Sequence, residues 1–306
     1  MYARGQALIS VLEDIADQYQ VVQAILDWRS LSRDHGFVEQ AAGHDRLHPT
    51  WGQTRSGTSR IYASKPAVQN VSRDLRHLFV PGPGHVLIKA DYSQAQMRIL
   101  ADLSGDEELN RLFREGEDAH DVTAKWLGVD RDSAKKVNFG ICFGISAVGL
   151  AARINLIRHD QGLPPIDEAT AQTYIDGLYA RYPRVKEFFD SQWEKLKRTR
   201  QSQRVVTSPS GRIRQFDFRA TSAMERKVRV TVPQQIEADL IKTAIVRLDR
   251  IFRRRNMGAH IVMMIYDALW VEAPRKEEAE VRHLVTRMMD TAGKPWLRVR
   301  MEVTLS

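Results

Sequence analysis

The chain has 306 residues, of which 43% are hydrophobic and 27% charged, a balance typical of a water-soluble globular protein with a sizeable core. Forty-six lysines and arginines against thirty-eight acids give a formal net charge of +8, which favours a polyanionic partner without establishing one. No apolar run approaches the length of a membrane span, no signal-peptide pattern opens the chain, and the single cysteine excludes an intrachain disulfide, so we expect a reducing, cytoplasmic compartment.

The first part of the chain changes from helical to irregular and then to strand-like patterns. Apolar residues recur at helical spacing over residues 6 to 34, which predicts one or two helices. Residues 40 to 83 are rich in Gly, Ser, Thr, Pro and Arg and indicate loops with short strands. The run HVLIKAD predicts a buried strand that ends at Asp91. Helical patterns follow over residues 93 to 127, with residues 118 to 120 expected on a connection.

The segment RDSAKKVNFGICFG predicts a helix with one chemically distinct side. Arg131, Lys135, Phe139 and Phe143 recur every fourth residue. Each such step on an α-helix advances only about 40° beyond a full turn, so these four side chains share one broad side of the helix. Two cations beside two aromatic rings make a surface suited to a triphosphate and a base.

The second half of the chain alternates helices with short irregular segments and ends in strands. A polar loop is expected at residues 158 to 168, helices at roughly 168 to 200, a turn at SPSGR, and a helix from about 222 to 256 that is interrupted near Pro233. The run IVMMIYDALWVEA has apolar segments on both sides of Tyr266 and Asp267, as a β-hairpin with an acid at its tip would. RVRMEVTLS predicts a terminal strand.

Two aspartates, Asp91 and Asp267, occupy strand-like apolar runs where a carboxylate needs a reason. If the fold brings them together, they form a hard oxygen site suited to paired Mg²⁺ ions, which is the equipment of phosphoryl transfer. The alternative interpretation is that they are two unrelated acids at the ends of strands.

In this order, the segments resemble the three polymerase motifs of family A DNA polymerases, the bacterial DNA polymerase I type. DYSQAQMRILADLSGDEEL resembles motif A, RDSAKKVNFGICFG resembles motif B, and IYDALWVE resembles motif C. Further segments have counterparts in family order, namely SVLEDIADQY with ILDWRSLSRDHG, TSRIYASKPAVQN, FREGEDAH and VPQQIEADLIKTA. The resemblance therefore covers nearly the whole chain, and a collinear series of this length is not expected by chance.

The resemblance implies an α/β (α+β) fold, the palm of a right-hand polymerase. An antiparallel sheet would be backed by helices, with a helical fingers subdomain inserted and the thumb mostly absent. The expected divisions are residual thumb-like helices at 1–39, palm with motif A at 40–103, fingers with motif B at 104–220, and palm with motif C at 221–306. No room is expected for a proofreading exonuclease or a 5′ nuclease.

The resemblance also implies an activity. The chain would be a template-directed DNA polymerase that adds dNTPs to a primer 3′-hydroxyl by two-metal-ion phosphoryl transfer, with two Mg²⁺ ions as cofactors. Asp91, Asp267 and the backbone carbonyl of Tyr92 match the metal ligands, and Lys135 completes the catalytic set. The implied dNTP-binding residues are Tyr92, Gln96, His120, Arg131, Lys135, Phe139 and Phe143.

Within that set the resemblance implies separate tasks. Arg131, Lys135 and His120 would hold the phosphates, Phe139 would stack on the base and sugar, and Phe143 would pack near the templating pair. Gln96 stands where the family has the glutamate that blocks a ribose 2′-hydroxyl.

The implied partners are primer–template DNA and dNTPs, with no membrane and with a processivity or thumb-supplying protein as a further expected partner. The compartment would be the nucleoid or a viral replication site. Polar contacts in the minor groove check the shape of a base pair without reading its sequence. The implied DNA-binding residues are Arg60, Gln69, Asn70, Lys227, Gln235 and Tyr266.

Several positions depart from the family pattern. Motif C has Tyr266, Asp267 and Ala268 where His-Asp-Glu is usual, and Gln235, Ile236 and Glu237 stand where the family has Gln-Gly-Thr. The departures leave two alternatives open. One is an enzyme like the single-subunit RNA polymerases, which a comparison of dNTP with rNTP incorporation would distinguish. The other is a catalytically weak DNA-binding remnant or a subunit of a split polymerase.

Overall fold

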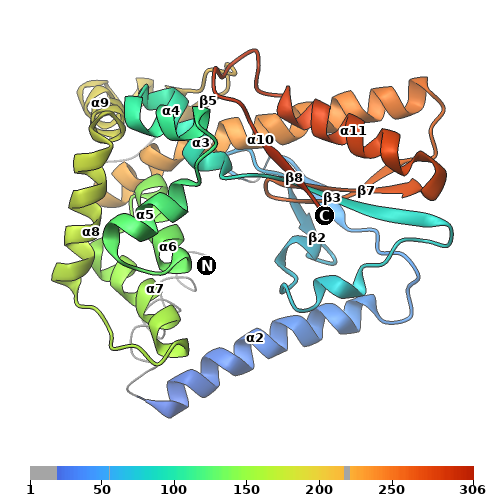
Figure 1. Ribbon diagram of the computed structural model, residues 1–306, viewed down its shortest axis with the longest axis horizontal. Helices are drawn as coiled ribbons and strands as arrows, with labels where there is room; N and C mark the ends of the chain where they lie inside the picture. The colour runs from blue at the N-terminus through green and yellow to red at the C-terminus, as the bar shows by residue number, and fades with distance from the viewer. Residues whose placement is uncertain (1–18, 55, 217–220) are drawn as a thin grey trace. The chain divides into compact units, whose positions relative to one another are not determined.

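The computed structural model (Figure 1) describes residues 19–54, 56–216 and 221–306. It divides into two compact units. The first unit comprises Met1–Gly52, of which residues 19–52 are described, with Tyr62–Phe79 and Ser146–Ala171. The second comprises Gln53–Ile61, Val80–Ile145 and Gln172–Ser306. In the described residues no helix has both the length and the apolar character needed to cross a bilayer.

The first unit contains helices and a short antiparallel pair of strands. Strands β1 (Thr50–Gly52) and β2 (Tyr62–Ser64) pair antiparallel, so the irregular region predicted from composition contains short strands as expected. The helices are α2 (Gln20–Ala41), the 3-10 turns η1 (Val68–Asn70) and η2 (Arg76–Leu78), α7 (Ala147–Asp160) and the beginning of α8 (Glu168–Arg181).

The second unit is built on a four-stranded antiparallel sheet in the order β6-β7-β3-β8. Its strands are β3 (His85–Tyr92), β6 (His260–Ile265), β7 (Ala268–Pro274) and β8 (Val303–Leu305). Alternate residues of β3, namely Ile88, Ala90 and Tyr92, are buried, as expected for a strand with one face against a core. Helices α10 (Ser222–Arg254) and α11 (Glu278–Asp290) share that hydrophobic core (Figure 1). The antiparallel sheet backed by helices confirms the predicted fold class.

Shorter helices and a small hairpin form most of the rest of the second unit. They are α3 (Ala95–Ser104), α4 (Glu107–Arg114), α5 (Ala119–Leu127), α6 (Arg131–Phe143) and α9 (Pro183–Arg198), followed by the hairpin β4 (Val205–Thr207) and β5 (Ile213–Gln215). Asp106 and Asp118 cap α4 and α5 by accepting backbone N–H hydrogen bonds. The prediction that residues 118 to 120 lie on a connection is therefore wrong in part, because the Asp118 cap begins α5 at Ala119.

The predicted interruption of the long helix near Pro233 is also wrong. Helix α10 continues through Pro233 over 33 residues. A proline inside a helix removes one backbone hydrogen bond and crowds the preceding turn. Here Val232, Ile236 and Leu240, which surround the proline, are buried in the core, and we attribute the continuity of the helix to that packing. The terminal strand is also shorter than predicted, since β8 has three residues.

Candidate functional site

Strand pairing places Asp91 and Asp267 at adjacent positions of the sheet. In the β3–β7 ladder Asp91 lies opposite Ala268, and the backbone N–H of Tyr92 donates to the carbonyl of Asp267 at 3.4 Å. Strands β6 and β7 are joined by the two-residue turn Tyr266–Asp267, in which Tyr266 has a φ of 55°. Two-residue hairpin turns require such left-handed backbone. The hairpin with an acid at its tip is therefore formed as predicted, and the fold brings the two aspartates together.

The carboxyl of Asp267 resists ionisation. Burial is the main cause, and the negative charges of Glu237 and Asp91 add to it, so the pKa of Asp267 is raised to about 8. Asp91 is exposed by comparison. Among the described residues no three His, Cys, Asp or Glu side chains gather into a group that could hold a metal ion. A cation here would therefore need water, backbone or substrate oxygens as well, which is how Mg²⁺ is usually bound.

A third acid of this region, Glu237 on α10, is a site residue that the sequence reasoning missed. It is 2% exposed, accepts hydrogen bonds from Arg60 Nη2 at 2.9 and 2.7 Å, and accepts one from Gln96 Nε2 at 2.8 Å. The guanidinium carbon of Arg60 also lies 5.7 Å from the centre of the Tyr266 ring. The signal available in the sequence was an acid next to the core residue Ile236, since a buried charge needs a partner.

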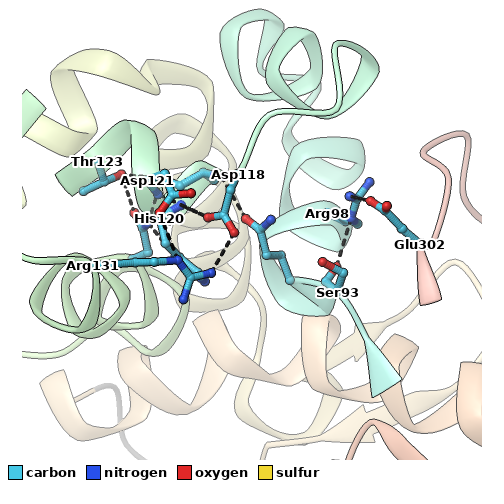
Figure 2. A network of polar contacts seen from close by, with 11 residues as sticks. Ser93, Arg98, Asp118, His120, Asp121, Thr123, Arg131 and Glu302 are labelled. Atoms are coloured by element: carbon cyan, nitrogen blue, oxygen red, sulfur yellow. Dashed lines mark hydrogen bonds and ion pairs between the residues drawn. The ribbon is translucent and has the colours of Figure 1, made fainter. Parts of the chain in front are cut away.

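Helices α5 and α6 present a second group of charges, which are paired with one another (Figure 2). Arg131 Nη2 donates to Asp118 at 2.7 Å, and Arg131 Nε lies 2.9 Å from a carboxylate oxygen of Asp121. Asp118 also caps α5 by accepting from the backbone N–H groups of His120 and Asp121. Burial would raise the pKa of Asp118, but Arg131 and these N–H groups outweigh it and lower that pKa. The hydrogen bond that Arg131 donates to Asp118 in turn raises the pKa of Arg131.

His120 is a buried, neutral member of the same network. It is 3% exposed, and Asn138 Nδ2 lies 2.8 Å from its Nδ1. Because the amide nitrogen can only donate, Nδ1 acts as an acceptor and the ring proton lies on Nε2. Burial lowers the pKa of His120 to about 4, partly opposed by the charge of Asp118. The ring lies 5.9 Å from that of Phe139, centre to centre.

Most of the residues predicted to share one side of α6 lie on an accessible side of that helix. Arg131 is exposed and Lys135 and Phe139 are half-buried, whereas Ala134 and Val137 on the opposite side belong to the core. The ammonium of Lys135 lies 5.7 Å from the centre of the Phe139 ring. The side chain of Phe143 lies outside the described residues, as does that of the single cysteine.

Other predicted residues have structural engagements. The hydroxyl of Tyr92 donates to the carbonyl of Met289 at 2.9 Å, and burial raises the pKa of this hydroxyl. The side chain of Tyr92 is therefore used in the core, which leaves its backbone carbonyl for the metal-binding role that the resemblance implies. Gln69 is buried and accepts from the backbone of Ala63 at 2.8 Å within the first unit, where the exposed Asn70 also lies. In the second unit, Lys227 and Tyr266 are exposed and Gln235 is buried on α10.

Comparisons with known proteins give a consistent result. A family model described as DNA polymerase family A matches residues 6–306. The chain is similar to DNA polymerase I of Caldicellulosiruptor bescii, with 33% identity over 92% of this chain and 35% of the relative. It is similar to the thermostable DNA polymerase I of Thermus thermophilus, with 32% identity over 97% of this chain and 37% of the relative. The chain thus spans about a third of the length of these relatives.

A solved structure, the POL domain of Pol1 from M. smegmatis in complex with DNA primer-template and dNTP, resembles the fold. The TM-score is 0.82 at 26% identity, and the match covers 97% of this chain and 55% of that chain.

Proposed function

Because the chain belongs to DNA polymerase family A, we propose that it catalyses the template-directed addition of dNTPs to a primer 3′-hydroxyl. The observation that carries this proposal is the pair Asp91 and Asp267. The two residues are far apart in the sequence, and the pairing of β3 with β7 places them side by side at one end of the sheet. The similar M. smegmatis domain, described as a complex with primer-template and dNTP, supports DNA and nucleotides as the partners of this chain.

The oxygen donors at this pair fit Mg²⁺. The carboxylates are hard ligands, the neighbouring acids disfavour an unneutralised charge on Asp267, and the small number of side-chain ligands leaves positions for water and phosphate. Asp91, Asp267 and the backbone carbonyl of Tyr92 would hold two ions. When bound, the ions would acidify the attacking hydroxyl and neutralise charge on the phosphates. To bind an ion, Asp267 would have to lose the proton that burial helps it to keep.

Helix α6 would bind the nucleotide through its accessible side. Lys135 and Arg131 offer cations to the phosphates, and Phe139 offers a ring to the base and sugar. Arg131 is paired with Asp118 and Asp121, so phosphate binding would exchange carboxylate partners for phosphate oxygens. The buried, neutral imidazole of His120 would help to hold the phosphates by donating its Nε2 proton to them.

The primer terminus would lie near the sheet end that carries Asp267. Arg60 and Tyr266 in the second unit are stacked beside that end, which suits a contact with the last primer nucleotide. We assign further duplex contacts to Lys227 and Gln235 in the same unit, and to Gln69 and Asn70 in the first unit.

Primer extension by the purified chain tests this function. We expect extension of a primed template with dNTPs and Mg²⁺, and Asp91→Ala or Asp267→Ala should lower its rate by about a thousandfold or more, since the carboxylates supply several kcal/mol of metal-dependent stabilisation. Asp249→Ala is the control, because this acid of α10 is exposed and pairs with Arg253 one turn along the helix. Undiminished extension by either site variant would contradict the proposal, and preferential use of rNTPs by the parent would favour the RNA polymerase alternative.

A further inference from the structure

Glu237 is a buried carboxylate to which the proposed reaction gives no task. It lies on α10, is 2% exposed, and has two partners from distant parts of the chain, Arg60 and Gln96. Removing a carboxylate from water requires several kcal/mol of compensation from pairing and hydrogen bonds. Arg60 and Gln96 supply that compensation, and in doing so both become fixed in position beside the end of the sheet that carries Asp267.

The contact with Glu237 determines how the amide of Gln96 is oriented. An ionised carboxylate can only accept hydrogen bonds, so Gln96 must present its Nε2 to Glu237 and its Oε1 elsewhere. Gln96 is 8% exposed, and its Oε1 is buried with no hydrogen-bond partner in the part of the chain that the structure describes. Gln235 lies on the same helix as Glu237, and its Oε1 is also buried without a hydrogen-bond partner among the described residues. Buried acceptors of this kind are rare in folded proteins unless water or a ligand satisfies them.

We propose that Glu237 is a positioning residue that holds Gln96 with its amide oxygen presented as the acceptor for a sugar hydroxyl of the incoming nucleotide. This inference rests on the proposed function, because it takes a nucleotide as the ligand. A sugar hydroxyl can donate to Oε1 at the same place in every nucleotide, whereas the N–H donors of a base differ in position from one base to the next and an ionised phosphate offers none. The shared chemistry is a hydroxyl donor, and either the 3′- or the 2′-hydroxyl could supply it.

The same helix provides a matched control. Asp239 lies two residues after Glu237, is also buried, and also pairs with an arginine, Arg212, and with a neutral donor, the hydroxyl of Ser210 at 2.6 Å. Asp239→Asn therefore removes the same kind of buried ion pair from the same helix without touching Gln96. A general effect of losing such a pair on stability should be common to both variants.

The test measures nucleotide affinity without catalysis. A primer–template whose primer ends in a dideoxynucleotide cannot be extended, so equilibrium titration with dNTP, ddNTP and rNTP reports binding only. We expect the parent to bind dNTP about three- to tenfold more tightly than ddNTP if the 3′-hydroxyl is recognised, the value of one neutral hydrogen bond. If the 2′-hydroxyl is recognised instead, rNTP should gain by a similar factor over dNTP.

Glu237→Gln should abolish whichever preference the parent has, because a second amide in place of the carboxylate can pair with either end of the Gln96 amide. The exchange variant Gln96→Glu with Glu237→Gln should restore it, since a carboxylate oxygen again becomes the presented acceptor. Asp239→Asn should keep it. Equal preferences in the parent and Glu237→Gln, or a failure of the exchange variant to restore them, would overturn the inference while leaving the polymerase proposal intact. Absence of any nucleotide binding by the parent would overturn both.

Discussion

The end of the sheet and the α5–α6 network handle charge in opposite ways. At the sheet end, the negative charges of Glu237 and Asp91 oppose the ionisation of Asp267, and buried acceptors of Gln96 and Gln235 lack partners among the described residues. In the α5–α6 network, Arg131 is already paired with Asp118 and Asp121 (Figure 2). Under the proposed function, a cation at the sheet end would offset the charges that oppose ionisation of Asp267, whereas a phosphate at Arg131 would have to displace carboxylates.

The difference has a consequence for pH dependence. A group held neutral by its surroundings changes stability only between its folded and unfolded pKa values, and the sign depends on whether the group is an acid or a base. Asp267 is an acid with a raised pKa and His120 is a base with a lowered one. The two regions should therefore respond oppositely to pH, and each response can be isolated with one substitution.

The largest expected effect is at Asp267. The folded protein keeps this proton up to about pH 8, whereas the unfolded chain releases it near the ordinary pKa of 3.8. Between these values the folded state binds more protons, so Asp267 makes the free energy of unfolding fall as pH rises, by up to about 6 kcal/mol in total. Asp267→Asn should remove this trend and be the more stable protein at pH 8.

Urea unfolding of the metal-free parent and Asp267→Asn at pH 5 and pH 8 measures this effect. Mg²⁺ added at pH 8 should stabilise the parent and not the variant. A parent and variant whose stabilities differ equally at both pH values would show that Asp267 ionises normally, and the contrast between the two regions would be lost.

The second effect concerns His120 and has the opposite sign. The unfolded chain takes up a proton near the ordinary pKa of 6.5, whereas the folded protein does so only near 4. The unfolded state therefore binds more protons between these values, and stability contributed by neutral His120 is lost as pH falls from 6.5 to 4, by about 3 kcal/mol. His120→Gln should remove this component, since glutamine can still accept from Asn138.

The measurement is the difference in free energy of unfolding between the parent and His120→Gln at pH 7 and pH 4. His159→Gln serves as the control, because this histidine is exposed on α7. A difference that does not change with pH would mean that His120 becomes protonated without opposition from its surroundings.

Asp267 and His120 also show what the sequence could and could not predict. The strand that ends near Asp91, and the hairpin with Asp267 in its turn between Ile265 and Ala268, follow from local apolar runs and were predicted correctly. The accessible side of α6 follows from helical spacing. The burial of His120 depends on Asn138, which lies eighteen residues later on another helix, and no local pattern encodes that contact.

Glu237 makes the same point more strongly. Its partner Arg60 is 177 residues away in the chain, so its burial becomes understandable only when the fold places the two together. The local chemistry of Pro233 predicts a helix break, yet the core packing of Val232 and Ile236 favours continuity. Local signals predict elements well where the local free energy decides the outcome, and fail where tertiary packing or a distant charge does.

The smallest expected effect tests the pairing of Arg131. The Arg131–Asp121 ion pair is solvent-exposed, with about half of each side chain accessible, and such pairs contribute roughly 0.2–1 kcal/mol. If phosphate must displace this partner, Asp121→Asn should lower the KM for dNTP by up to about fivefold, with little change in kcat. Steady-state primer extension over a range of dNTP concentrations measures both constants.

Asp132→Asn is the matched control, because it removes an equal charge from the exposed residue next to Arg131. An equal decrease of KM in both variants would indicate a general electrostatic effect of the added positive balance. A decrease confined to Asp121→Asn would indicate that releasing Arg131 from its carboxylates is part of nucleotide binding, and an increase would show that Asp121 instead holds the guanidinium where the phosphates need it.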